Sequence, residues 1–323
     1  MLRLKTLIGL TVSIAAVCAS GIALGETYPS RPITFIVPFG PGGGADQLAR
    51  VASKLMEPEL KVSLPVINVP GATGQNGLTK LVTSPADGYT LSVMTGDTFS
   101  LFASPTARFK LEQFTPLAIM IQQPSGLFVN ATGPYQTWED VLKVIKEKEL
   151  RTGISGYGSP DDLTISYFKG KGMKFQGVPF AEPGMRYASV VGGQSDILYE
   201  QAGDVRSFLD GKQIKPVLFF SKKPSDLFPD VPYSGKLGYD VFLTQFRVIM
   251  VRSETNPAIV KTLSESLAHA SQNQEYRDYL KQQYADPDSF VPADKSVQYM
   301  KDWLSEAGQL LGASAGAPAA SPK

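Results

Sequence analysis

Cysteine and histidine are almost absent from this chain of 323 residues, because Cys18 and His269 are the only examples of each. Zinc sites of the usual kinds need several such side chains, so no metal site is expected. His269 lies in a polar helical stretch, where a surface or packing residue is more typical than a catalytic base. Residues 312–316, GASAG, match a nucleophile-elbow pattern, but no strand precedes them and no histidine follows. We therefore expect no cofactor and no catalysis.

A strong excess of charge is also lacking. The chain has 31 Lys and Arg residues against 30 Asp and Glu residues. Loss of residues 1–25 would remove Arg3 and Lys5 and no acid, leaving 29 basic residues against 30 acidic ones, a net charge of −1. A face that binds nucleic acid needs a strong basic excess, so no nucleic-acid partner is expected.

The N-terminal segment has the pattern of an export signal. Arg3 and Lys5 precede an apolar run over residues 7–17, and small residues then lead to Gly25. The run is short for a membrane span, although an anchor helix is the alternative. We expect residues 1–25 to be a signal peptide and the mature protein to lie in the periplasm. Val17 before Cys18 does not fit a lipoprotein signal, so no lipid anchor at Cys18 is expected.

From residue 32 onward, short apolar runs alternate with amphipathic segments, which is typical of an α/β fold with mainly parallel sheets. Strands are expected at residues 33–38, 64–69 and 90–94, each followed by a polar or glycine-rich loop. The carboxyl ends of strands in an open parallel sheet face one crevice. These three loops are therefore expected to lie close together.

The segment LAIMIQQPSGLFVN, residues 117–130, indicates a crossing between two domains, because a proline in mid-run argues against one central strand. The chain is expected to return near residues 242–250. The predicted organisation is a signal peptide at residues 1–25, domain 1 at 26–121 and 244–311, domain 2 at 122–243, and a mobile low-complexity tail at 312–323.

The first glycine loop lies in ITFIVPFGPGGGADQLAR, residues 33–50. Gly40, Gly42 and Ala45 match a dinucleotide-binding pattern, but Pro41 stiffens the turn and no acid follows the second strand to bind a ribose. The loop has no lysine, which excludes a phosphate-binding P-loop. An α/β oxidoreductase that binds a nucleotide at this loop remains the alternative from another functional class.

A second glycine loop, NVPGATGQNG at residues 68–77, follows the next strand. Free N–H groups at the start of a helix attract anions, and glycine lets a ligand approach the backbone closely. Two such loops side by side could hold a carboxylate without any arginine. The alternative is that both are only tight turns between strand and helix.

Three motifs resemble the receptors of tripartite tricarboxylate transporters, also called the Bug family of periplasmic solute-binding proteins. They are YPSRPITFIVPFGPGGGADQLARVASKL at residues 28–55, PGATGQNG at 70–77 and SPADGYTL at 84–91. The resemblance implies a type II periplasmic-binding-protein (Venus flytrap) fold, with two α/β domains joined by two crossing strands. It also implies a monomer that binds a small aromatic or aliphatic carboxylate and delivers it to membrane transporter subunits of this type. A ligand-presenting partner of a sensor protein is an alternative.

The candidate ligand-binding residues come from the two loops and, through the resemblance, from the turn after the third strand and from the second domain. They are Phe39, Gly40, Pro41, Gly42, Gly43, Gly44, Asp46, Gly71, Ala72, Thr73, Gly74, Thr95, Gly96, Asp97, Thr98, Gly156, Tyr157, Gly158, Ser159, Phe180, Asp196 and Glu200. Asp46 is expected to orient its helix more than to contact an anion, because like charges repel.

The identity of the ligand stays open at this point. Phe180 and Tyr157, together with Phe99 and Tyr199, could line a pocket for an aromatic acid or belong to the core. Acids such as Glu200 could receive an amine or a hydroxyl group, so an amino acid or a hydroxy acid is not excluded. The sequence departs from the family pattern here, since Phe180 replaces the usual tyrosine and residues 181–182 replace Lys-Gly.

Overall fold

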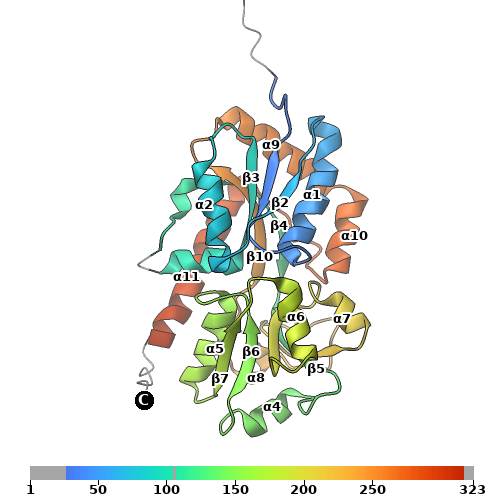
Figure 1. Ribbon diagram of the computed structural model, residues 1–323, viewed down its shortest axis with the longest axis vertical. Helices are drawn as coiled ribbons and strands as arrows, with labels where there is room; N and C mark the ends of the chain where they lie inside the picture. Colours follow the sequence, from blue (N-terminus) through green and yellow to red (C-terminus); the bar gives the residue numbers. More distant parts are fainter. Residues whose placement is uncertain (1–26, 105–106, 316–323) are drawn as a thin grey trace, which may run out of the picture.

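The computed structural model describes residues 27–104 and 107–315, and these residues form two α/β domains, one above the other in Figure 1. The expected signal peptide and the last part of the expected tail, residues 316–323, lie outside the described residues. Each domain is built around its own β-sheet, and the chain passes between the domains at Pro124 and again before residue 245. These crossings lie next to the domain limits that the sequence predicts.

The sheet of the first domain has the strand order β11-β4-β10-β3-β1-β2. Its strands are β1 (Thr34–Val37), β2 (Val66–Asn68), β3 (Thr90–Thr95), β4 (Phe114–Gln123), β10 (Gln245–Arg252) and β11 (Val291–Pro292). β1 pairs in parallel with β2 and β3, whereas β10 runs antiparallel to β3 and β4.

The sheet of the second domain has the order β7-β6-β8-β5-β9. Its strands are β5 (Ser125–Asn130), β6 (Leu150–Ile154), β7 (Phe175–Pro179), β8 (Ile197–Gln201) and β9 (Ile214–Phe219). β6 pairs in parallel with β7 and β8, and β5 runs antiparallel to β8 and β9.

Both sheets are therefore mixed, and the expectation of mainly parallel sheets needs correction. The reason lies in the crossings. β5 and β10 each enter their domain from the other one, so they begin at the boundary between the domains and run away from it. The neighbouring strands β3 and β8 run toward this boundary, and their pairing with β10 and β5 is consequently antiparallel.

Helices cover both faces of the sheets, and α1 shows how the sequence specifies them. Leu48, Ala52 and Met56 recur at four-residue spacing and are buried, so one stripe of α1 packs on the sheet. The helices are α1 (Gly44–Leu60), α2 (Gln75–Thr83), α3 (Gly96–Phe99), α4 (Trp138–Val144), α5 (Pro160–Gly170), α6 (Pro183–Val191), α7 (Arg206–Asp210), α8 (Ser234–Leu237), α9 (Pro257–Ser271), α10 (Gln274–Gln282) and α11 (Ala293–Ala315). Short 3-10 helices are η1 (Ala72–Gly74), η2 (Ser100–Ala103) and η3 (Leu111–Gln113).

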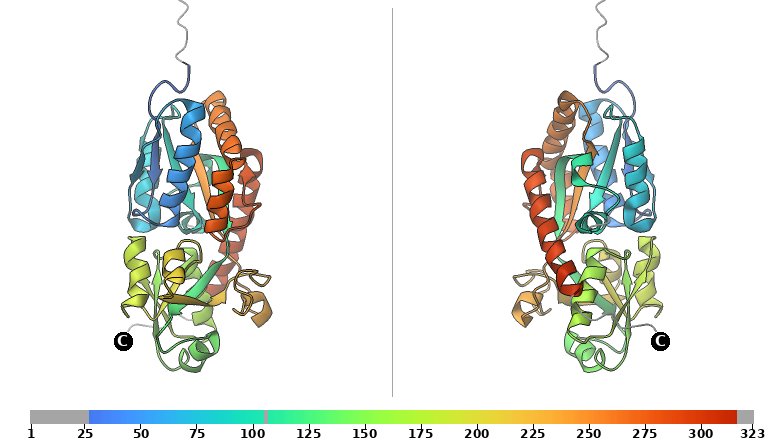
Figure 2. Two further views of the ribbon diagram at one scale, coloured as in Figure 1. Left: turned by 90° about the vertical axis from the view of Figure 1, so that its right-hand side faces the viewer. Right: turned by 90° about the vertical axis from the view of Figure 1, so that its left-hand side faces the viewer.

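The last helix, α11, joins the two domains along one side of the molecule (Figure 2). It packs against β4 and η2 in the first domain and against α5 in the second. Trp303 of α11 contacts the rings of Phe99 and Phe246, and its indole N–H donates to the carbonyl oxygen of Thr244 at 2.8 Å. Residue 311 is the predicted end of domain 1, but α11 continues to Ala315, so the first residues of the expected tail are helical.

None of the helices within the described residues combines the length and the apolar character needed to cross a membrane.

Candidate ligand-binding site

The carboxyl ends of β1, β3, β6, β7 and β8 meet at the boundary between the domains, and a small cavity of about 30 Å³ lies there. A cavity of this size has room for about one or two water molecules. Its lining residues are Phe39, Gly43, Gly44, Ala45, Thr95, Asp97, Gln245 and Arg247 from the first domain and Ser155, Phe180, Ala181, Pro183, Arg186, Tyr187, Glu200, Gln201 and Asp204 from the second. The two domains are thus closed on each other around this cavity.

Asp46 holds the first glycine loop in place through hydrogen bonds on the side away from the cavity. The carboxylate of Asp46 accepts hydrogen bonds from the Gly42 N–H at 3.0 Å, from Arg50 at 2.9 Å and from the Asn68 amide at 3.0 Å. The same Asn68 amide also donates to the carbonyl oxygen of Phe39. Burial alone would raise the pKa of Asp46, but these hydrogen bonds hold it below its ordinary value. Asp46 does not line the cavity, and its contacts are those of a residue that orients the loop and α1.

The loop presents the start of α1 to the cavity. Gly43 is the N-cap of α1 and offers no side chain to the free N–H groups of the first turn. A Cβ atom built on Gly43 would lie 2.7 Å from Cγ of Pro183 in the other domain, and one on Gly40 would collide with Glu182. Glycine at these positions lets the second domain approach the helix start closely. By contrast, Pro41 is exposed and Gly42 faces open space.

The second glycine loop contacts the Gly/Ser turn of the second domain and does not line the cavity. The backbone of Ala72 and Thr73 has positive φ, and the Thr73 hydroxyl lies 3.5 Å from the carbonyl oxygen of Tyr157. A Cβ atom on Gly156 would collide with Thr73. Nearby, Ser100 donates to the carbonyl oxygen of Gly158 at 2.6 Å. Thr73 therefore meets Gly156 and Tyr157 at the rim of the cleft, next to Gly158. Gly71, Ala72 and Gly74 belong to the same glycine loop, and Ser159 is the buried N-cap of α5.

The turn after β3 brings a carboxylate into the cavity. Asp97 accepts hydrogen bonds from Thr95 at 3.0 Å, from the Gln245 amide at 2.6 Å and, across the domain boundary, from the Ser155 hydroxyl at 2.9 Å. Thr98 does not reach the cavity, because its hydroxyl lies under Gly74. Gly96 packs close to the side chains of Gln245 and Trp303. Thr95 and Asp97 are thus the members of this turn that line the site.

Two arginines lie in the cleft, where the sequence predicts a seat made of backbone amides without arginine. Arg247 of β10 forms an ion pair with Asp204 across the domain boundary and donates to the Gln123 side chain at 2.8 Å. Arg186 of α6 forms an ion pair with Glu200. The side chains of Arg247 and Asp204 are only 2% and 3% exposed, so the first pair is almost fully buried. The two arginines lie beside the predicted seat, and a carboxylate held by backbone amides alone stays a prediction.

Burial dominates the electrostatics of this cluster. It raises the pKa of Asp161 to about 7, with a further increase from Asp97 and an opposing effect from Arg186. It also raises the pKa of Glu200 to about 7 against the opposing effect of Arg186. The pKa of Asp204 is raised by burial as well. For Arg186, burial alone would lower the pKa, but the neighbouring carboxylates raise it.

A sequence model described as the tripartite tricarboxylate transporter family receptor matches residues 48–314 of this chain. The chain belongs to this family.

Among its relatives in the family, BugT of Bordetella pertussis is 28% identical over 310 residues, and the match covers 94% of each chain. MatC of Rhodopseudomonas palustris, solved with bound malate, has a TM-score of 0.79 and 22% identity, covering 88% of this chain and 100% of MatC. A second R. palustris protein, solved with adipate, has a TM-score of 0.82 and 20% identity, covering 89% of this chain and 98% of that one. The expected two-domain periplasmic-binding-protein fold and the family resemblance are confirmed.

Asp196 is a candidate residue that lies far from the cavity. It precedes β8, at the end of the strand opposite to Glu200, and its carboxylate pairs with Arg151 at 3.0 Å. The backbone N–H of Arg151 also donates to Asp196 at 2.9 Å. Asp196 and Glu200 thus lie at opposite ends of β8, and of these two acids only Glu200 lines the cavity.

The four aromatic candidates also separate in the structure. Phe99 is buried among Phe246 and other rings, and Tyr199 is buried and stacks on Phe220 with ring centroids 5.4 Å apart. Both belong to the core. Phe180 lines the cavity, whereas Tyr157 is 65% exposed at the rim. The cavity is lined by five charged side chains and three aromatic ones.

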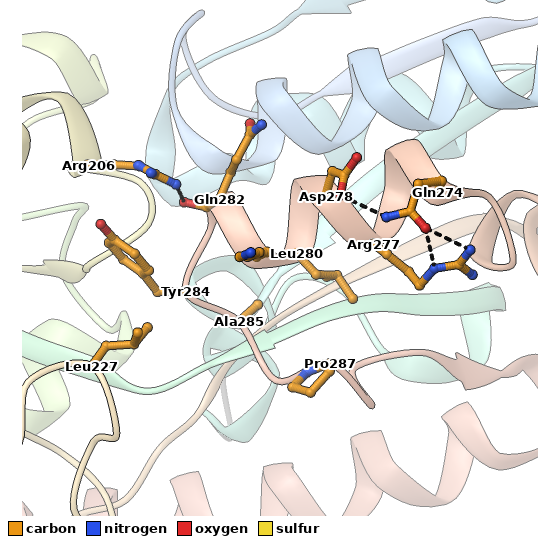
Figure 3. A pocket seen from close by; sticks show the side chains of 11 residues that line it. Arg206, Leu227, Gln274, Arg277, Asp278, Leu280, Gln282, Tyr284, Ala285 and Pro287 are labelled. Carbon is orange, nitrogen blue, oxygen red and sulfur yellow. Dashed lines mark hydrogen bonds between the residues drawn. The ribbon is translucent and has the colours of Figure 1, made fainter.

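A larger groove of about 710 Å³ lies on the outer surface beside α10 (Figure 3). Arg206 of α7 reaches across it, where its guanidinium donates to the carbonyl oxygen of Gln282 at 3.2 Å and lies 5.1 Å from the ring centroid of Tyr284. Gln274 connects Asp278 and Arg277 through hydrogen bonds along the far side. The bond between Arg206 and Gln282 therefore links the two domains at the outer surface, whereas the bonds of Gln274 stay within α10.

The described residues hold no group of three or more His, Cys, Asp or Glu side chains arranged to bind a metal ion.

Proposed function

We propose that this protein is an exported, monomeric receptor that closes its two domains over a small carboxylate and delivers it to the membrane subunits of a tripartite tricarboxylate transporter. The observation that carries the proposal is the uncapped start of α1, where Gly43 and Gly44 line a cavity shared by both domains. Free N–H groups at a helix start bind anions through direct hydrogen bonds and the helix dipole.

The relatives support a carboxylate ligand. The structures with bound malate and adipate belong to proteins of the same fold, and both ligands carry two carboxylates. A ligand that contacts both domains favours the closed state by its higher affinity for that state. A membrane partner can then recognise the closed state, as in other hinge-type receptors.

We propose binding without catalysis. Ser155 is a hydroxyl at the cavity, and it interacts with the carboxylates of Asp97 and Asp161. His269 lies on an exposed face of α9, with a side chain that is 70% exposed and 3.0 Å from Glu59. A hydroxyl without a nearby imidazole base lacks the usual means of activation.

The experiment is a thermal-shift screen of the protein from residue 26 against carboxylates and, separately, against nicotinamide and flavin nucleotides. A ligand that binds only the native state at 100 times its Kd stabilises it by about 2.7 kcal/mol. We expect carboxylates to raise Tm and nucleotides to leave it unchanged. Stabilisation by a nucleotide together with no response to any carboxylate would overturn the proposal in favour of a nucleotide-binding enzyme.

A further inference from the structure

Carboxylates outnumber guanidinium groups in the cleft. Asp97, Glu200 and Asp204 line the cavity together with only two arginines, Arg186 and Arg247. Each arginine forms an ion pair, Arg186 with Glu200 and Arg247 with Asp204, and the buried Nε of each has no hydrogen-bond acceptor among the described residues. A fourth carboxylate, Asp161, lies 3.9 Å from Arg186 behind the lining. The closed cleft therefore holds more acidic side chains than arginines before any ligand is counted.

Two buried oxygen atoms at the same cavity have no hydrogen-bond donor among the residues that the structure describes. They are Oδ1 of Asp204 and Oε1 of Gln245. Both side chains line the cavity, and the two residues are only 8% and 5% exposed. The amide nitrogen of Gln245 already donates to Asp97, so the oxygen is the part of this group that is free to bind. Buried acceptors of this kind are normally paired, and both require a donor.

The position of one of these acceptors is informative. A Cβ atom built on Gly44 would collide with the guanidinium of Arg247 and with Oδ1 of Asp204, so both ends of this ion pair lie directly against the start of α1. The helix start, which can bind a carboxylate, therefore lies next to Oδ1 of Asp204, which can accept a hydrogen bond from the ligand. A plain dicarboxylate would bring its negative charge next to Asp204 and Asp97, which is unfavourable in a buried site.

We propose that the ligand carries a protonated amine next to a carboxylate, as an α-amino acid does. This inference rests on the proposed function. The ammonium group has three donors and no acceptor, which matches Asp204, Gln245 and Asp97. The adjacent carboxylate then binds the N–H groups at the start of α1.

The crowding of acids supports this assignment independently of the hydrogen bonds. Burial is the largest cause that raises the pKa of Asp161 and of Glu200 to about 7, and the neighbouring carboxylates raise it further, Asp97 for Asp161 and Asp204 and Asp97 for Glu200. A positive group in the ligand relieves this effect, whereas a second carboxylate increases it.

The test is calorimetric titration of the mature protein at pH 7.5 with pairs of ligands that differ only in an α-amine. The pairs are aspartate and succinate, glutamate and glutarate, and alanine and propionate. We expect the amine-bearing member of at least one pair to bind at least about tenfold more tightly than its partner. If the plain acids bind equally or more tightly in every pair, the inference fails and the proposed function stands. If neither member of any pair binds, the inference fails, and the thermal-shift screen above decides the proposed function separately.

A charge variant tests the role of the cleft acids. Asp97→Asn removes one negative charge without leaving an arginine unpaired, because the partners of Asp97 are neutral. We expect this variant to reduce the preference for the amine-bearing ligand by about tenfold. The matched control is Asp196→Asn, which removes the same charge at the opposite end of β8 and should leave the preference unchanged. An unchanged preference in Asp97→Asn, with Tm close to that of the wild type, would overturn the inference.

Discussion

Closure of the two domains depends on a close approach at Gly43, and Gly43→Val tests this directly. Gly43 has φ of −78° and ψ of 168°, a conformation that valine adopts readily. Its added Cβ atom would lie 2.7 Å from Cγ and 3.1 Å from Cβ of Pro183, which belongs to the second domain. The conflict therefore arises only when the domains are closed.

The magnitude follows from these distances. Carbon atoms in contact prefer a separation of about 3.5–4.0 Å, so the two domains must separate by roughly 1 Å at this point. Overpacking of this kind costs about 1–3 kcal/mol. If the cost falls only on the closed state, Kd for the ligand rises by about 5- to 150-fold. Valine at an N-cap also destabilises α1 by about 1 kcal/mol, but this affects the open and closed states alike.

Two measurements separate these effects. Calorimetry reports Kd for the ligand, and thermal unfolding of the free protein reports the stability of α1. The control is Gly184→Val, one residue beyond Pro183, because a Cβ atom at Gly184 has no neighbour within 4 Å. We expect weakened binding in Gly43→Val and unchanged binding in Gly184→Val. Equal affinity for the ligand in both variants and the wild type would refute the role of this contact in closure.

Three further predictions concern the cleft and its supports. Arg247→Gln leaves Asp204 buried and unpaired, which destabilises the closed state by about 3–5 kcal/mol. Small-angle scattering should therefore show a larger radius of gyration for this variant than for the control Arg151→Gln. Equal radii of gyration would contradict this role of the ion pair. Burial raises the pKa of Asp161 and of Glu200 to about 7. Between about pH 4 and 7 the native state therefore binds more protons than the unfolded state. This contribution to the free energy of unfolding is lost as pH rises. Calorimetric Tm should therefore fall less steeply over this range in Asp161→Asn, and an identical slope would argue against the assignment. Trp303→Ala should lower the free energy of unfolding by about 3–5 kcal/mol, because the ring is buried between α11 and the first domain; in urea unfolding, a loss no greater than that of the exposed Leu237→Ala would contradict the role of α11.

The sequence was informative where a local pattern decides the structure. The glycine run followed by an amphipathic segment predicts a loop and then a helix. The structure has this loop at residues 38–43, and α1 begins at Gly44 with Gly43 as its N-cap. The proline at residue 124 predicts the crossing between the sheets for an equally local reason, since proline has no backbone N–H group to donate to a neighbouring strand.

The charged cluster could not be predicted in the same way, because its pairs are distant in the chain. Arg247 and Asp204 are 43 residues apart, and their pairing depends on how the two domains meet. One local signal was available: Arg247 stands inside the apolar run that forms β10, and a charge in a buried strand requires a partner. The position of Asp196 could not be predicted for a different reason. Asp196 and Glu200 are only four residues apart, but they lie at opposite ends of β8, and the sequence does not show which end faces the other domain.

A crystal structure with a carboxylate that stabilises the protein tests the central claim most directly. We predict carboxylate oxygens at hydrogen-bond distance, about 2.7–3.2 Å, from backbone nitrogens at the start of α1, near Gly44 and Ala45. A ligand in the outer groove beside α10, or one that contacts Arg186 or Arg247 without any contact to α1, would contradict the account.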